Sequence, residues 1–203
     1  MASGSLVYLV RHGESIGNVT PGLRRRDDPP LTDRGRAQAA RAAEALAGLG
    51  IGALFSSPLR RARETAEIIG AATGAGIQVA EGFREVDMGA LSDSDAAEDR
   101  ALRDAIFSAW LAGDYRRSFP GGEDFPAVIR RAREELRRIL ATAGGPGVAV
   151  VTHRMPIAAA AALCEGGSAL APGACPNGAI SVLEPQDGGR WRLVAWGDAR
   201  HLA

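Results

Sequence analysis

Short apolar runs alternate with segments of helical periodicity along the chain. Three runs of strand length, rich in β-branched or other apolar residues, cover residues 6–10, 54–56 and 147–152, and each ends at a polar corner. Strands that alternate with helices are typical of a mainly parallel sheet with helices on both faces. The pattern therefore predicts the α/β class, as a three-layer α/β/α domain.

Helical periodicity predicts five helices between and after these strands. Thr32 is expected to cap an alanine-rich helix that extends to about Leu46, where Gly48 and Gly50 end it. The other helices are predicted over residues 58–69, 93–112, 125–141 and 154–163. Residues 180–183 and 191–196, with a Gly-Gly pair between them, predict a C-terminal hairpin.

The composition is that of an ordinary globular chain. The 203 residues are 46% hydrophobic and 24% charged, without repeats or long linkers, so a single domain over residues 1–203 is expected. A net charge of zero argues against nucleic acid and membrane surfaces as partners. No apolar run approaches bilayer length, and we expect a cytoplasmic protein. Cys164 and Cys175 lack metal-ligand spacing and are interpreted as small buried hydrophobic residues.

The first strand ends in Arg11-His12-Gly13. An imidazole beside a guanidinium suits an anionic electrophile such as a phosphoryl group. We interpret Gly13 as the residue whose missing Cβ lets a ligand oxygen approach the backbone. A histidine after a strand is more often a surface or packing residue, so this corner by itself does not establish catalysis.

Two further corners repeat the arrangement. The run 147–152 ends at His153, and the run 54–56 turns at Ser57-Pro58 into a helix with arginines in its first turn, where a bound anion is favoured. Ligands of α/β proteins bind beyond the carboxyl ends of parallel strands. We therefore expect the three corners to converge on one crevice, with an acidic segment, residues 82–89, at its rim.

Five motifs follow one another between Leu6 and about Leu183. They are Arg11-His12-Gly13-Glu14-Ser15 with Asn18, Asp28-Pro29-Pro30-Leu31-Thr32 with Gly35 and Gln38, Ser57-Pro58-Leu59-Arg60-Arg61-Ala62 with Thr65-Ala66, Arg84-Glu85, and Thr152-His153. Their order and spacing resemble the histidine phosphatase superfamily, which has the phosphoglycerate-mutase-like fold.

The resemblance implies a role for each matching residue. His12 would be the nucleophile and become a phosphohistidine. Arg11, Arg61 and His153 would hold the phosphoryl oxygens, with Asn18 as a further donor. This division agrees with the needs of phosphoryl transfer, which are an in-line nucleophile and neutralisation of charge on the equatorial oxygens.

The resemblance also implies that Glu85 is the proton donor to the leaving oxygen and then the base for water. On composition alone Glu85 is equally a solvated charge among Glu81, Asp87 and Asp93, and Asp87 is the second candidate. Arg61 is preferred to Arg60 because it directly precedes the alanine of the family pattern. Arg60 and Arg63 are interpreted as solvated helix surface.

Two departures from the family pattern bear on substrate choice. His153 is usually followed by glycine, but here by Arg154, and Arg25 lies in an arginine triplet that replaces a glycine-containing segment. We expect Arg25 and Arg154 to bind substrate anions. The alternatives are a solvated turn for Arg25 and an outward helix-start residue for Arg154.

These features predict a phosphatase that needs neither a metal nor another cofactor and hydrolyses a small phosphorylated metabolite through phosphohistidine. The expected partner is a small-molecule phosphate ester, and a homodimer is left open. The first alternative is a phosphoglycerate-mutase-type phosphotransferase, although family mutases are longer after the acid residue. The second is a binding module of the same fold without catalysis, against which the presence of all five core residues argues.

Overall fold

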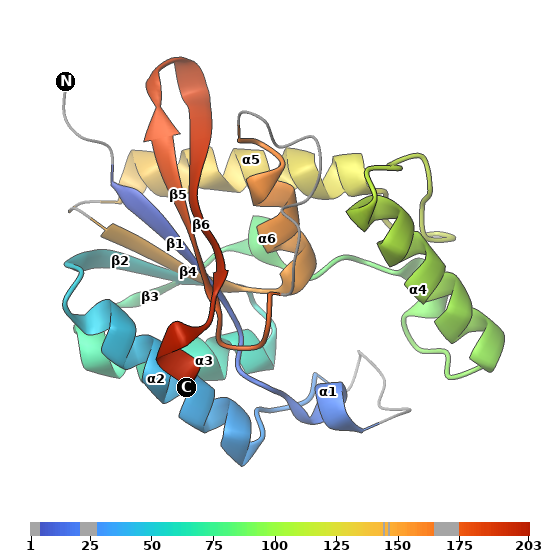
Figure 1. The fold of residues 1–203 in the computed structure, drawn as a ribbon, viewed down its shortest axis with the longest axis horizontal. Coiled ribbons are helices and arrows are strands. Elements are labelled where there is room, and N and C mark those ends of the chain that lie inside the picture. Colours follow the sequence, from blue (N-terminus) through green and yellow to red (C-terminus); the bar gives the residue numbers. More distant parts are fainter. Residues whose placement is uncertain (1–4, 21–27, 144, 146, 165–174) are drawn as a thin grey trace.

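The computed structural model describes residues 5–20, 28–143, 145, 147–164 and 175–203. Six strands form one sheet in the order β3-β2-β4-β1-β5-β6 (Figure 1). They are β1 (Leu6–Arg11), β2 (Ile51–Ser56), β3 (Ile77–Val79), β4 (Gly147–Thr152), β5 (Ile180–Gln186) and β6 (Arg190–Asp198). The first four are parallel, and β5 and β6 form an antiparallel hairpin beside β1. The predicted mainly parallel sheet with a C-terminal hairpin is confirmed.

Helices cover both faces of this sheet. The α-helices of the described residues are α1 (Ile16–Val19), α2 (Asp33–Ala47), α3 (Arg60–Thr73), α4 (Ala97–Leu111), α5 (Phe125–Thr142) and α6 (Arg154–Ala161). Helices α2 and α3 lie on one face and α5 and α6 on the other, whereas α4 lies beyond the layers, near one end of α5 (Figure 1). No helix in the described ranges is long and apolar enough to cross a membrane.

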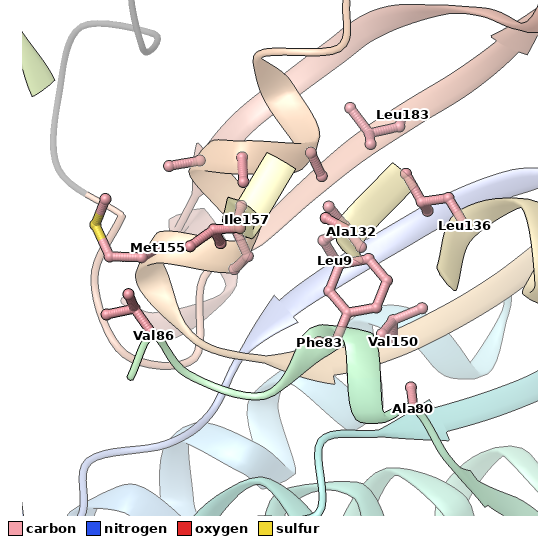
Figure 2. Close-up of a cluster of buried hydrophobic side chains, with 14 of the residues drawn as sticks. Leu9, Ala80, Phe83, Val86, Ala132, Leu136, Val150, Met155, Ile157 and Leu183 are labelled. Atoms are coloured by element: carbon pink, nitrogen blue, oxygen red, sulfur yellow. The ribbon is translucent and has the colours of Figure 1, made fainter. Parts of the chain in front are cut away.

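The alternation of side chains along β1 divides the core in two. Val7 and Leu9 belong to the hydrophobic cluster that includes α5 and α6 residues, whereas Tyr8 and Val10 belong to the cluster with α2 and α3. Successive side chains of a strand point to opposite faces of the sheet, and in β1 both faces are buried by helices. Figure 2 shows the first cluster, in which Phe83 lies beside Leu9 of β1.

Two helices begin later than predicted. Helix α4 begins at Ala97 instead of residue 93, because the Ser94 hydroxyl donates to the Asp99 carboxylate and accepts from the Ala96 amide, which favours a turn over a helix. Helix α3 begins at Arg60 instead of residue 58. The predicted cap of α2 is present, since the Thr32 side chain accepts from the Gly35 amide at 3.0 Å.

Candidate active site

The carboxyl ends of β1, β4 and β2 lie next to each other in the sheet. The residue after β1, His12, donates its amide to the Thr152 carbonyl at the end of β4, at 2.9 Å. The residue after β2, Ser57, donates its amide to the Val151 carbonyl, also at 2.9 Å. Parallel pairing to the central strand β4 therefore brings the three predicted corners to one edge of the sheet.

The imidazole of His12 is held in one tautomer. His12 is 3% exposed, and its Nδ1 lies 2.7 Å from the Gly13 carbonyl oxygen. A carbonyl can only accept, so Nδ1 carries the proton and Nε2 keeps a lone pair. Nε2 accepts from Arg61 Nε at 3.1 Å, and the His153 ring centroid is 5.0 Å from that of His12.

The environment of His12 keeps the imidazole neutral. Burial, and then the charges of Arg61 and Arg11, hold the pKa of His12 well below its ordinary value of 6.5, against the weaker opposing effect of the Gly13 carbonyl. A neutral imidazole is required of a nucleophile. The position of His12 between two cations therefore supplies a reactive form at neutral pH.

We expect the His12 ring to remain neutral when the free enzyme is titrated from pH 8 to about pH 6. The unfolded chain binds this proton near 6.5 and the folded chain only at lower pH, so acidification below about 6.5 also favours unfolding. NMR of the ring protons measures the midpoint of the His12 titration. The His12 signal is assigned as the one that is lost in His12→Ala. Arg61→Gln should raise the midpoint and Arg63→Gln, an exposed change on the same helix, should not. A His12 midpoint at 6.5 or higher in the unmodified protein contradicts this account.

Arg11 and Asn18 are oriented by neighbouring backbone. Arg11 Nη1 donates to the Cys175 carbonyl at 2.7 Å, and burial lowers the pKa of the Arg11 guanidinium, which stays cationic. Its buried Nε has no hydrogen-bond partner among the described residues. The Asn18 Oδ1 accepts from the Ser15 amide at 2.9 Å, which leaves the Asn18 NH₂ as the group that can donate to a ligand.

Ser57, which the sequence analysis placed in the third motif without a role, contacts His153. Ser57 is fully buried, and its Oγ lies 2.8 Å from His153 Nε2. The signal that could have revealed this role is the position of Ser57 directly after β2, the neighbour of β4. Arg61 is also largely buried, with a side chain 11% exposed, whereas Arg60 is 55% exposed and pairs with Glu64.

The turn at residues 175–178 contacts the backbone of His12. The side-chain amide of Asn177 donates to the His12 carbonyl at 3.0 Å, and the backbone amide of Gly178 donates to the same oxygen at 3.2 Å. His201 lies 3.0 Å from the Gly178 carbonyl through Nε2. His201 is therefore a half-buried contact of this turn and not the exposed tail residue that its place near the C-terminus suggests.

A cavity of about 220 Å³ connects most of these residues. The residues that line it are Arg11, His12, Ser15, Gly17, Asn18, Pro29, Arg61, Glu85, Val86, Met88 and Phe107. The cationic groups therefore face an apolar wall to which α4 contributes through Phe107. Local sequence pattern does not predict this wall, because Phe107 of α4 joins Val86 and Met88 only in the folded chain.

The structure places Glu85, and not Asp87, against this cavity. Glu85 lines both the cavity and a neighbouring one of about 310 Å³, and Asp87 lines only the second. Glu85 Oε1 accepts from the Val86 amide at 2.9 Å, while the exposed Asp87 accepts from the Gly89 amide. Glu85 is thus the better positioned of the two candidate acids.

Of the two candidate substrate-binding arginines, the structure describes Arg154, whereas Arg25 lies outside the described residues. Arg154, the first residue of α6, is exposed and is absent from the described residues that line the cavity. Its charge is close enough to lower the pKa of Arg11, after the larger effect of burial. The structure therefore favours the outward, helix-start interpretation of Arg154.

The structure gives the missing Cβ of Gly13 a different role from the one that the sequence suggested. A Cβ at Gly13 would lie 2.2 Å from the Gly35 carbonyl oxygen, and a Cβ at Gly35 would lie 1.9 Å from the Glu14 carbonyl oxygen. Real Cβ atoms do not approach so closely. The missing Cβ of Gly13 therefore makes room for the first turn of α2. This close contact fixes the loop that follows His12 against the layer of helices.

The predicted anion site at the start of α3 is occupied by the protein itself. The Asp28 carboxylate accepts from the Arg60 amide at 2.9 and 3.0 Å, and thus caps the helix from another segment. Asp28 adopts a φ of 40°, which is uncommon outside glycine. The charge of Arg61, and not the helix terminus, is consequently what α3 presents to a ligand.

Comparisons with known proteins agree with this geometry. The family profile of the histidine phosphatase superfamily (branch 1) matches residues 7–199. The chain is 32% identical to a probable phosphoglycerate mutase, GpmB, of Salmonella paratyphi B, with 97% of this chain and 94% of the relative covered.

Solved structures with the same fold include phosphatases. A mycobacterial glucosyl-3-phosphoglycerate phosphatase in complex with VO3 has a TM-score of 0.83 and 30% identity, and 97% of this chain and all of that chain (100%) are covered. Bacillus stearothermophilus YhfR has a TM-score of 0.84 and 29% identity, with 98% and 100% covered. Phosphatases and mutases of this group share phosphoryl transfer. The chain belongs to the histidine phosphatase superfamily.

Proposed function

We propose that this protein is a phosphatase that hydrolyses small phosphate monoesters through a phosphohistidine on His12. The observation that carries the proposal is the setting of His12, a buried imidazole that lines a cavity together with Arg61 and Arg11 and whose pKa these cations and burial hold low. This combination suits attack on a phosphoryl group, because the arginines neutralise charge on the phosphoryl oxygens.

The proposed reaction has two steps. In the first, Arg61 exchanges its hydrogen bond to His12 Nε2 for one to a phosphoryl oxygen, which frees the Nε2 lone pair. This lone pair forms a bond to phosphorus while the ester P–O bond breaks, and the leaving oxygen takes a proton from Glu85. In the second, the Glu85 carboxylate takes a proton from water, the water oxygen bonds to phosphorus, and the P–N bond breaks. Inorganic phosphate leaves, and both side chains return to their starting forms.

No metal ion is needed in this scheme, because Arg11 and Arg61 supply the positive charge. Within the described ranges, no group of three or more His, Cys, Asp or Glu residues could hold one. The apolar wall formed by Val86, Met88 and Phe107 would contact the leaving group. It favours esters whose leaving group carries an apolar surface.

A phosphoglycerate mutase is the second candidate, since near full-length relatives carry that name. The two activities differ in the acceptor in the second step, which is water for a phosphatase and a substrate hydroxyl for a mutase. The first candidate is supported by the mycobacterial glucosyl-3-phosphoglycerate phosphatase of the same fold, which has been solved both with VO3 and with inorganic phosphate.

A turnover assay separates the candidates. We expect the purified protein to release phosphate from 4-nitrophenyl phosphate at an unchanged rate in excess EDTA. Incubation with 3-phosphoglycerate and a bisphosphorylated primer should give free phosphate and little 2-phosphoglycerate. Predominant formation of 2-phosphoglycerate would identify a mutase, and loss of activity in EDTA that magnesium restores would exclude the metal-independent mechanism.

A further inference from the structure

The segment that carries Glu85, residues 82–89, is called the acid loop below. It has no helix or strand of its own around Glu85, so other elements must hold it. Its first part is fixed by a fully buried Phe83, which lies beside Leu9 and Val150 (Figure 2), and by the Thr152 hydroxyl, which donates to the Phe83 carbonyl at 2.6 Å. These contacts hold the start of the loop to the sheet but do not reach Glu85.

Arg131 of α5 holds the loop on the N-terminal side of Glu85. Its Nη1 donates to the Gly82 carbonyl at 2.8 Å and to the Arg84 carbonyl at 2.7 Å. The same guanidinium binds Glu123 in a fork, with Nε to Oε1 at 2.7 Å and Nη2 to Oε2 at 3.0 Å. One planar side chain thus joins α5, the residue before Glu85 and the turn that precedes α5.

Glu123 holds the loop on the other side of Glu85. Its Oε2 accepts from the Asp87 amide at 2.8 Å, and its backbone amide donates to the Asp87 carbonyl at 2.9 Å. The Arg131 and Glu123 side chains are only 21% and 23% exposed, so solvent screens this pair less than it would a fully exposed one. Glu85 is therefore bracketed, with Arg131 on residue 84 and Glu123 on residue 87.

Three glycines show that the acid loop packs directly against α5 and against the turn that precedes α5. A Cβ at Gly82 would lie 2.7 Å from the Arg131 carbonyl oxygen. At the other end, a Cβ at Gly122 would lie 2.4 Å from the Asp87 carbonyl oxygen, and Gly89, with a φ of 54°, would meet the Pro120 carbonyl at 2.3 Å. Backbone packs on backbone at both ends, which leaves the segment between them little freedom.

We propose that the Arg131–Glu123 pair is a clamp that positions the Glu85 carboxyl for proton transfer to the leaving oxygen. The inference rests on the proposed function, because it assumes that Glu85 is the acid. Neither clamp residue is among those that line the 220 Å³ cavity, so both act through Glu85 as positioning residues. General acid catalysis depends on hydrogen-bond geometry, and a loosened loop loses it while the nucleophile and the arginines stay in place.

The test compares two substrates in the phosphorylation step, measured by single-turnover quench. An alkyl phosphate needs a protonated leaving oxygen, whereas 4-nitrophenolate leaves readily without a proton. Arg131→Met should slow phosphorylation by the alkyl substrate by about tenfold or more, because part of the contribution of the general acid is lost. Phosphorylation by the aryl substrate should slow by less than about threefold. The aryl rate reports that the same preparation is folded.

Further variants separate the clamp from a structural effect. Arg131→Lys keeps the charge but not the fork, and Glu123→Gln keeps the volume but not the charge, so both should also lower the alkyl-to-aryl ratio. Arg133→Met, an exposed change on the same helix, should leave the ratio unchanged. In a Glu85→Gln background, Arg131→Met should change the ratio by less than about twofold, because the two residues act as one unit.

The outcomes distinguish two failures. If Glu85→Gln lowers the alkyl-to-aryl ratio but the Arg131 and Glu123 variants slow both substrates equally, the clamp is wrong and the proposed function stands. If Glu85→Gln leaves the ratio unchanged, Glu85 is not the acid, and the clamp falls with that assignment. Additive effects of Arg131→Met and Glu85→Gln on the ratio would also overturn the clamp.

Discussion

His12→Ala should lower turnover by roughly a thousandfold or more and abolish covalent labelling, because His12 is the only histidine among the described residues that line the cavity. The measurement is phosphate release from 4-nitrophenyl phosphate, together with a quench in alkaline denaturant of the reaction with radiolabelled substrate, which preserves a phosphohistidine. In the unmodified protein the label should be acid-labile and confined to His12.

The His12→Ala variant should still fold. The backbone amide of His12 donates to the Thr152 carbonyl, and the His12 carbonyl accepts from the Asn177 side chain. Neither hydrogen bond involves the imidazole. Circular dichroism and the thermal unfolding midpoint check this. Near-native turnover by a folded His12→Ala protein, or a label on His153 instead, would contradict the proposed mechanism.

Glu85→Gln should slow phosphorylation by an alkyl phosphate by about a hundredfold or more, which is the range of general acid catalysis. Phosphorylation by 4-nitrophenyl phosphate should change far less, because its leaving group departs without a proton. Single-turnover kinetics are needed, because Glu85 is also the proposed base in the second step and its loss slows steady-state turnover for both substrates.

Asp87→Asn is the matched control for Glu85→Gln. Asp87 has a carboxylate two residues away on the same loop, but it is exposed and does not line the 220 Å³ cavity. Asp87→Asn should therefore leave the alkyl-to-aryl ratio near that of the unmodified protein. If Asp87→Asn lowers the ratio and Glu85→Gln does not, the acid has been assigned to the wrong residue.

Five of the six strands, most of the helices and the meeting of the histidines follow from local pattern, whereas the short strand β3 was not predicted. Continuous apolar runs define β1 and β4, and the parallel arrangement requires that their ends, with His12 and His153, share one edge. Helix boundaries were less predictable. Where α3 starts depends on Asp28, which caps the Arg60 amide from 32 residues away.

The sequence by itself determined the fold class and the residue types that meet at the strand ends, because strand periodicity and the three polar corners are local properties of the chain. Only the tertiary structure distinguishes the positions of Glu85 and Asp87, two carboxylates of the same loop, because Glu85 lines the 220 Å³ cavity and Asp87 does not. The backbone on either side of Glu85 is held by Arg131 and Glu123, which lie far along the chain. Such contacts depend on packing between distant segments, and no local pattern encodes them.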